Sequence, residues 1–378
     1  MKNHMTSHND IQGSGEHGME TQTVARYAQS QLMGLGRALA LPEARVAALG
    51  ELFHAATATW GTRGLDAPAP WSAVGEDGSP YEFSVAFGAK GAELRVLVEA
   101  QALPASARAY WDAGLALSRE LEGRAGARLE HLERLADLFS PPQPTSFCAL
   151  WHALRLPATG VPDARVYLNP AAKGPEHTLD VVRESLERLG LGARWEDVER
   201  MRGAHGRVPL LALDLSEEVI FKVYLSRDGL TVEDLEAWSA RTFDSSAGDA
   251  RALCSAMLPT SGPYGLLDIR TCFTMRGSEG GRPSRWVTSV TGGAVGPDAL
   301  FRERLVRLME SQGIPVAPYL RCLEVMAPGG LGDAQGLHAG VTLQRERGVP
   351  RVTVYFSPRL YRDRPHLPEA WRAWTQAA

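Results

Sequence analysis

Apolar residues recur along this chain with two alternating periods, that of an α-helix and that of a β-strand. Helical spacing fills 23–59, 105–139 and 176–201, and in the last stretch Leu179, Val182 and Leu186 share one face. Pairs of short strand-like runs lie between the helical stretches, and the first run of each pair begins near residue 81, 147, 208, 267 or 337. A unit of one helical stretch and two strands therefore recurs every 60 to 70 residues or so.

Two later helices carry recognisable boundary signals. Thr231 and Asp234 have the spacing of a capping box, which predicts that a helix begins there. Another helix is expected to begin near Pro297 and Asp298 and to end by Gly313.

Short turns join the two strands of each pair, so we expect five antiparallel hairpins and ten strands. A repeating unit that cannot bury its own apolar face must pack on its neighbours, and closure into a barrel removes both sheet edges. The sequence therefore predicts an α+β fold in which a ten-strand antiparallel barrel is surrounded by helices, as one domain over 23–378. Residues 1–22 are polar without apolar periodicity and are predicted to be a disordered tail.

Composition narrows the class of protein further. The chain of 378 residues is 44% hydrophobic and 22% charged, which is an ordinary globular balance. Its net charge of −4 provides no general attraction for nucleic acid or an anionic membrane. Its four cysteines are far apart, and no apolar run approaches the ~20 residues of a membrane span. These features favour a cytoplasmic protein with reduced thiols, as a monomer or homodimer with no nucleic-acid or membrane partner.

The second strands of several pairs share an unusual side-chain pattern. Arg165 and Tyr167, Lys222 and Tyr224, and Thr353 and Tyr355 are each two residues apart, and the first pair contributes Arg95. Residues i and i+2 of a strand point to the same face. If that face lines the barrel, the lumen holds a ring of cations and phenol rings suited to a diphosphate and a carbocation. The alternative is an outward face on which these side chains meet solvent.

The first hairpin follows an Asp77-Gly78-Ser79-Pro80 turn and places Glu82 in an otherwise apolar strand. Glu82 has the same parity as Ser84, so it is either a carboxylate facing the lumen or a glutamate on the solvent face of the strand.

The Ser-Pro-x-Glu-x-Ser motif at 79–84, followed in order by the Arg95, Arg165, Lys222 and tyrosine strands, resembles the dimethylallyltryptophan synthase family of aromatic prenyltransferases. The resemblance covers about 24 to 360 and implies the ABBA prenyltransferase barrel. It implies that Glu82 hydrogen-bonds an indole N–H, that Arg95, Arg165 and Lys222 bind diphosphate, and that Tyr167, Tyr224 and Tyr355 shield the donor. Arg207 resembles an arginine that binds the amino-acid carboxylate.

The chain also departs from the family pattern. Ile220 replaces a cation two residues before Lys222, the fourth hairpin lacks a Gln-x-Tyr motif, and the first strand of the second hairpin lacks the lysine found in fungal members. Which residue of 150–155 takes that place stays open. We include Trp151 and His338 among the candidate acceptor contacts, although His338 is equally typical of a satisfied structural histidine.

The expected activity is transfer of a dimethylallyl group from dimethylallyl diphosphate to the indole of tryptophan or a derivative. Two alternatives remain: prenylation of a phenol, and a non-catalytic barrel that binds an amphipathic ligand. The chain contains no Asp-Asp-x-x-Asp motif or Cys/His metal spacing, so no cofactor is expected and Mg²⁺ is not expected to be essential.

Overall fold

The computed structural model describes residues 22–67, 72–89, 91–142, 150–157, 159–242, 247–277, 285–346 and 348–361. Nearly all of the expected tail lies outside these ranges. The helices are α1 (Val24–Ala38), α2 (Glu43–Thr57), α3 (Ala107–Ala125), α4 (Glu130–Phe139), α5 (Thr178–Arg188), α6 (Trp195–Arg202), α7 (Val232–Ser239), α8 (Asp249–Met257), α9 (Gly292–Val295), α10 (Asp298–Ser311) and α11 (Ala317–Met326). The strands are β1 (Tyr81–Gly88), β2 (Gly91–Glu99), β3 (Leu150–Leu156), β4 (Asp163–Leu168), β5 (Arg207–Asp214), β6 (Ile220–Ser226), β7 (Ile269–Arg276), β8 (Arg285–Thr291), β9 (His338–Glu346) and β10 (Val349–Phe356).

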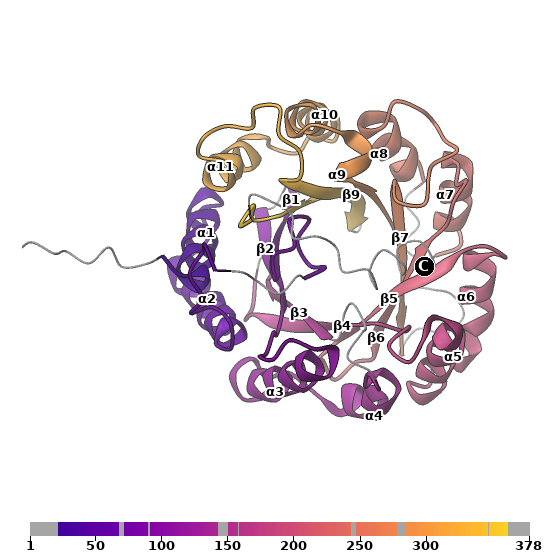
Figure 1. Ribbon diagram of the computed structural model, residues 1–378. Helices are drawn as coiled ribbons and strands as arrows, with labels where there is room; N and C mark the ends of the chain where they lie inside the picture. Colours follow the sequence, from indigo (N-terminus) through magenta and orange to yellow (C-terminus); the bar gives the residue numbers. More distant parts are fainter. Residues whose placement is uncertain are drawn as a thin grey trace, which may run out of the picture.

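The ten strands form one closed antiparallel barrel in the order β1-β10-β9-β8-β7-β6-β5-β4-β3-β2. Phe83 lies opposite Phe356 and Gly88 opposite Arg351, which closes the barrel between its first and last strands. The predicted fold of five hairpins in a helical ring is therefore confirmed (Figure 1). All odd-numbered strands run in one direction, so they begin at the same end of the barrel. We call this the upper end, and the end where the hairpin turns lie the lower end.

The stretch 176–201 contains two helices, α5 and α6, with Gly190 at φ of 73° between them, and the sequence pattern did not predict α8 and α11. The stretch 105–139 is two helices, because Gly126 with φ of 63° follows α3 in the left-handed region and ends it. The capping box before α7 is confirmed: Thr231 Oγ1 accepts from the Asp234 N–H, and the Asp234 carboxylate accepts from the Thr231 N–H.

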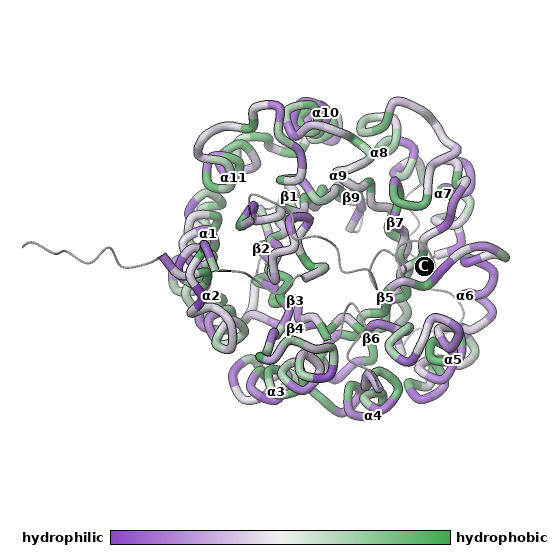
Figure 2. Tube along the Cα trace, viewed as in Figure 1, coloured by the Kyte–Doolittle hydropathy of each residue, from purple (hydrophilic) through white to green (hydrophobic). Residues whose placement is uncertain are grey.

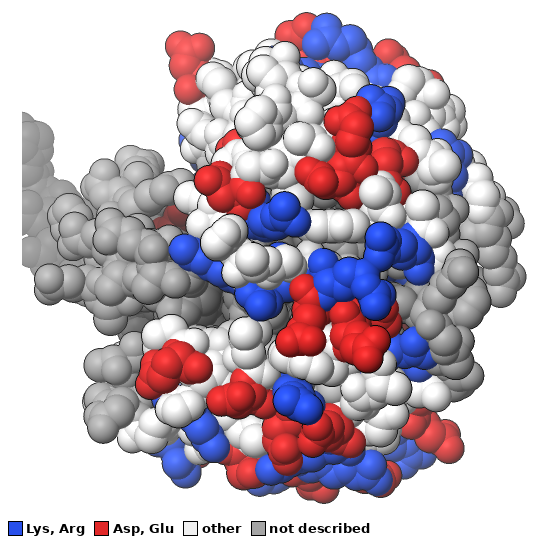
Figure 3. All heavy atoms as spheres, turned by 90° about the vertical axis from the view of Figure 1, so that its right-hand side faces the viewer, with Lys and Arg blue, Asp and Glu red and all other residues white. Residues whose placement is uncertain are grey.

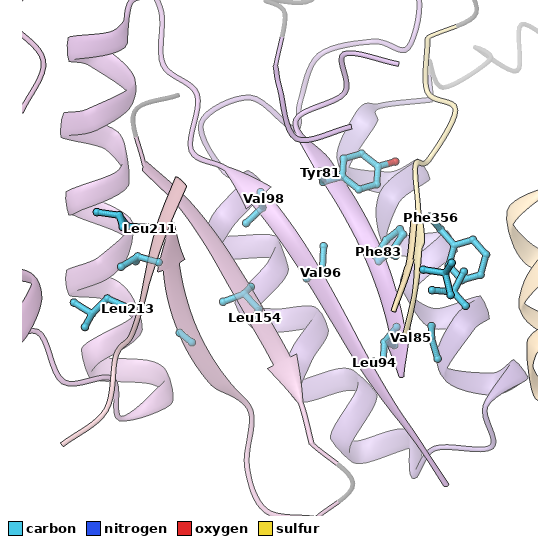
Figure 4. Close-up of a cluster of buried hydrophobic side chains, with 14 of the residues drawn as sticks. Tyr81, Phe83, Val85, Leu94, Val96, Val98, Leu154, Leu211, Leu213 and Phe356 are labelled. Atoms are coloured by element: carbon cyan, nitrogen blue, oxygen red, sulfur yellow. The ribbon is translucent and has the colours of Figure 1, made fainter. Parts of the chain in front are cut away.

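The main core lies between the outer face of the barrel and the helices. Phe83, Val85 and Phe87 alternate along β1 and are at most 2% exposed, and Phe53 of α2 packs edge-on against Phe83. Figure 4 draws part of this layer, with side chains from β1, β2, β3, β5 and β10. Hydrophilic residues of the helices lie mainly on the outer rim of the ring (Figure 2). Since this packing fixes one face of each strand, the alternate residues must line the lumen.

Two β-bulges change which side chains reach the lumen. Between Arg207 and Leu210 of β5 the register shifts, so that Leu210 pairs with Tyr224 and Arg207 pairs with Ser226. Between Tyr355 and Phe356 of β10 a second shift pairs Tyr355 with Gly340 and Phe356 with His338. An extra residue in one strand reverses the facing of the residues beyond it. The first bulge therefore brings Arg207 to the lumen face, and the second turns His338 away from it.

The outer surface carries charges of both signs. On the face in Figure 3, acidic and basic side chains lie next to each other. Ion pairs on the helices include Arg188 of α5 with Asp137 of α4, and Arg200 with Asp197 within α6. Among the helices that the structure describes, none combines the length and the apolar character needed to span a membrane.

Candidate active site

The strand register places the predicted cations and tyrosines on one face. Arg95 of β2 lies opposite Ser84 of β1, and Tyr355 of β10 lies opposite the same Ser84. On β4, Arg165 and Tyr167 lie opposite Asp214 and Ala212 of β5, and Ala212 in turn lies opposite Lys222 of β6. Their neighbours on these strands, such as Val166 and Val223, are fully buried in the outer layer. The cations and tyrosines therefore line the lumen together.

Two carboxylates hold four arginines in the lower half of the lumen. Asp214 is 4% exposed and pairs with Arg165, whose Nη2 donates to Asp214 Oδ2 at 3.0 Å. Nη2 of Arg155 donates to the same oxygen at 3.2 Å. Glu93 in the same way pairs with both Arg95 and Arg351. Each carboxylate thus fixes two guanidinium groups in place.

These ion pairs set the charge state of the lower half of the lumen. Burial acts to raise the pKa of Asp214 and of Glu93, but the adjoining arginines outweigh it and lower both pKa values to about 2. For Lys222, in contrast, the surroundings favour the neutral form of the side chain. Removal from water, together with the positive charge of Arg165, lowers the pKa of Lys222 to about 7. An anion that enters this region would therefore restore the proton on Lys222.

A layer of phenol rings lies next to the cations. The rings of Tyr167 and Tyr224 are 5.9 Å apart between centroids and tilted by 43°. Burial raises the pKa of Tyr224 and of Tyr355, so both keep their hydroxyl protons at neutral pH. Cys272 lies opposite Tyr224 and is 4% exposed. This layer can donate hydrogen bonds to an anion and present aromatic faces to a cation.

The starts of the odd-numbered strands form the upper part of the lumen. Glu82 and Trp151 are the second residues of β1 and β3, Arg207 is the first residue of β5, and Arg270 is the second residue of β7. Because these strands begin at the same end, the carboxylate, the indole and the two guanidinium groups lie around one opening.

Glu82 is half-buried and has an unusual acidity. Burial and the negative charge of Glu76 raise its pKa to about 8, while Arg270 acts in the opposite direction. A hydrogen-bond donor placed next to this carboxylate would favour its ionised form.

Trp151 forms an apolar wall at the upper end of the lumen, two strands away from Glu82. It contacts Val74 in a small lumen cluster that also involves Leu97, Tyr167 and Leu210. Its Nε1 donates to Glu99 Oε1 at 2.9 Å, which fixes the plane of the indole. Sequence reasoning did not identify Glu99, whose pKa is raised to about 7 by burial.

The turn before β1 is anchored over the upper end. Asp77 Oδ1 accepts from the Ser79 N–H at 3.1 Å and from the Ser357 hydroxyl at 3.1 Å, and Asp77 Oδ2 accepts from the Tyr361 N–H at 3.1 Å. Gly78 has φ of 82°, as expected of the Asp-Gly-Ser-Pro turn. A cavity of about 610 Å³ lies beside this turn, lined by Glu76, Asp77, Tyr361 and residues 326–330.

His338 is a correction to the candidate set. Its Nδ1 is 2.7 Å from Asp298 Oδ1, its Nε2 is 2.9 Å from the Tyr319 hydroxyl, and its ring stacks on Phe301 at 4.3 Å. These partners belong to α10 and α11, so His338 lies in the layer between barrel and helices and does not line the lumen. The bulge opposite Phe356 is the physical reason, because it turns the first residue of β9 outward.

In the second hairpin, β3 supplies the side chains at the place where fungal members of the family have a lysine. Trp151 and Arg155 face the lumen, whereas His152 points outward and its Nε2 is 2.8 Å from the Ser118 hydroxyl of α3. Arg155 is therefore the cation that β3 contributes. A single sequence does not reveal that Asp214 pairs with Arg155 or that Glu93 pairs with Arg351, because these contacts depend on the register between strands.

No group of three or more His, Cys, Asp or Glu side chains suited to a metal ion occurs in the ranges that the structure describes. Three of the four cysteines, Cys254, Cys272 and Cys322, are free thiols, and Cys148 lies outside the described residues.

No protein-family model matches the chain. Among solved structures, the prenyltransferase PriB is 32% identical, with 90% of this chain and 98% of that one covered and a TM-score of 0.82. The 5-dimethylallyltryptophan synthase of Streptomyces coelicolor is 30% identical, with coverage of 93% and 99% and a TM-score of 0.83. The 6-dimethylallyltryptophan synthase of Micromonospora olivasterospora is 27% identical, with coverage of 91% and 99% and a TM-score of 0.82. The closed ten-strand barrel and these identities over nearly the whole length place the chain in the dimethylallyltryptophan synthase family of ABBA-fold aromatic prenyltransferases.

Proposed function

We propose that the protein transfers a dimethylallyl group from dimethylallyl diphosphate to the indole ring of tryptophan or a small tryptophan derivative. The observation that carries this proposal is the order of groups along one lumen: a carboxylate and an indole wall at the upper end, then tyrosines, then a cluster of cations. Support comes from PriB, which was solved with L-tryptophan and dimethylallyl thiolodiphosphate, and from the two synthases, which were solved with tryptophan and a donor analogue.

The diphosphate donor binds among the cations in the lower half of the lumen. Arg95, Arg165 and Lys222 bind the diphosphate oxygens, with Tyr167, Tyr224 and Tyr355 as hydroxyl donors and as aromatic faces for the allyl group. The bond between the allyl carbon and the diphosphate oxygen breaks, and its electron pair leaves with the diphosphate. Because cations neutralise the leaving group, Mg²⁺ is not essential in this mechanism.

The aromatic acceptor binds at the upper end of the lumen, where Glu82 lies. Its carboxylate accepts a hydrogen bond from the indole N–H, Trp151 packs against the ring, and Arg207 binds the α-carboxylate. Nη1 of Arg207 is buried and has no hydrogen-bond acceptor within the described residues, which suits a site for an anion. The ring carbon then attacks the allyl cation, and a base takes the proton from the arenium ion, which restores aromaticity.

Incubation with dimethylallyl diphosphate and L-tryptophan, followed by mass spectrometry, tests the proposal. A product heavier than tryptophan by one dimethylallyl group is expected, with release of diphosphate. Turnover of phenols but not indoles would favour the phenol alternative. Binding without turnover of any aromatic acceptor would favour the non-catalytic barrel, although the charged lumen argues against it.

A further inference from the structure

Arg270 is a lumen residue to which the mechanism above assigns no role. It is the second residue of β7 and has the parity of Cys272, which lies opposite the lumen residue Tyr224. Its side chain is exposed at the upper end of the barrel. Within the part of the chain that the structure describes, its guanidinium forms no hydrogen bond or ion pair. A free guanidinium that overhangs a substrate cavity is available to an anion.

The strand register places Arg270 near Arg207. Arg207 lies opposite Ser226, and Leu225 lies opposite Thr271, so that Ser226 adjoins Arg270. The two arginines are therefore two strands apart, or about 10 Å between Cα atoms, with the Ser226 hydroxyl between them. Ser289 lies opposite Arg270 on the other side. Two guanidinium groups that flank a hydroxyl can both donate hydrogen bonds to one carboxylate.

The position along β7 separates Arg270 from the diphosphate region. Lys222 lies opposite Thr274, four residues further along the strand. Four residues of a strand span about 13 Å, and the layer of Tyr224 and Cys272 lies between. Arg270 is thus too far from the diphosphate cations to share their ligand.

The placement of Glu82 and Arg270 on opposite walls of the lumen suits a tryptophan. Glu82 is on β1, across the opening from β7, and the charge of Arg270 acts to lower the pKa of Glu82. The two groups are therefore near enough to interact across the lumen. One amino acid can place its indole N–H at Glu82 and its carboxylate at the arginines on the opposite wall.

We infer that Arg270 is a specificity-determining residue that binds the acceptor's α-carboxylate together with Arg207. The enzyme accordingly selects indoles with a free α-carboxylate over decarboxylated, amidated or cyclised ones. This inference rests on the proposed function, because it assigns the acceptor to the upper end of the lumen.

The test compares Arg270→Gln with wild type on two acceptors, L-tryptophan and tryptamine, which lacks the carboxylate. We expect kcat/KM for tryptophan to fall about ten- to a hundredfold and that for tryptamine to change less than about twofold. Arg270→Lys should recover part of the loss, because it keeps the charge. Arg307→Gln, on the exposed face of α10, is the matched control and should leave both acceptors unaffected.

Three outcomes would overturn the inference: unchanged kcat/KM for tryptophan, an equal loss on both acceptors, or wild-type enzyme that uses tryptamine as well as tryptophan. Failure of the proposed function is distinguishable from these. If wild type prenylates neither acceptor, calorimetric binding of the two ligands to wild type and Arg270→Gln still decides the point. Selective loss of tryptophan affinity supports the carboxylate site, and equal affinities refute it.

Discussion

Replacement of Glu82 by Gln separates the charge of this side chain from its shape. The carboxamide keeps the volume and a hydrogen-bond acceptor, but it cannot offset the positive charge that develops on the indole as the ring attacks. Loss of one such electrostatic partner typically costs about 10²–10³ in rate. The loss should appear in kcat more than in KM, because the interaction strengthens in the transition state.

The pH dependence of the wild-type enzyme gives an independent measure. With a pKa of about 8, Glu82 is mostly protonated at pH 7 and mostly ionised at pH 9. The ionised fraction rises from about 9% to about 91% over that range, so kcat/KM for the acceptor should rise about tenfold. Glu82→Gln should abolish this rise. Glu76→Gln should move it to lower pH, because the charge of Glu76 helps to raise the pKa of Glu82.

The assay varies tryptophan at saturating donor between pH 6 and pH 9.5, so that titration of Lys222 in the empty site does not contribute. Glu120→Gln, on the exposed face of α3, serves as the matched control. Unfolding does not confound the result. Since the folded state raises the pKa of Glu82 from 4.5 to about 8, the fold loses stability as pH rises between these values. Glu82→Gln should therefore be at least as stable as wild type at pH 8. Near-normal turnover by this folded variant would refute the indole-activating role.

The remaining predictions concern the donor site and the fold. Lys222→Ala and Arg165→Ala should weaken donor binding about ten- to a hundredfold, from roughly 1.5–3 kcal/mol per charged hydrogen bond, with tryptophan binding much less affected; equal losses would indicate a structural role. Diphosphate binding at pH 8 should take up a proton, since the pKa of Lys222 is about 7 in the empty site, and calorimetry in buffers of different ionisation enthalpy measures this. Turnover should persist in EDTA, because arginines and lysine neutralise the diphosphate; complete loss that Mg²⁺ restores would contradict this. Thr231→Ala should cost about 1 kcal/mol in urea unfolding, because it removes the cap of α7.

The parts of the site that the sequence predicts are those with a local signal. Lys222 and Tyr224 are two residues apart, so the strand period alone puts them on one face, and the same argument pairs Glu82 with Ser84. The prediction that His338 lines the lumen was wrong. By parity with Thr342 it belongs to the lumen, but the bulge beside Ala339 reverses its direction, and a single sequence carries no clear signal for that bulge.

Sequence reasoning also missed the contacts between residues that are distant in the sequence. Arg165 and Asp214 are 49 residues apart, and Arg351 and Glu93 are 258 residues apart. Their pairing depends on the order and register of the whole barrel. Periodicity predicts which residues share a face, but it does not say which of them meet.

Closure between β1 and β10 has a consequence for how this chain acquires its activity. One edge of β1 stays unpaired until β10 has been made, and β10 ends at Phe356, 268 residues after β1 ends at Gly88. Pairing across such a separation is slow, and an exposed edge can meanwhile pair with another chain. Glu82, on β1, therefore acquires its final surroundings only after β10 has been synthesised. A truncation before β10 would leave an aggregation-prone open sheet, and not a smaller enzyme.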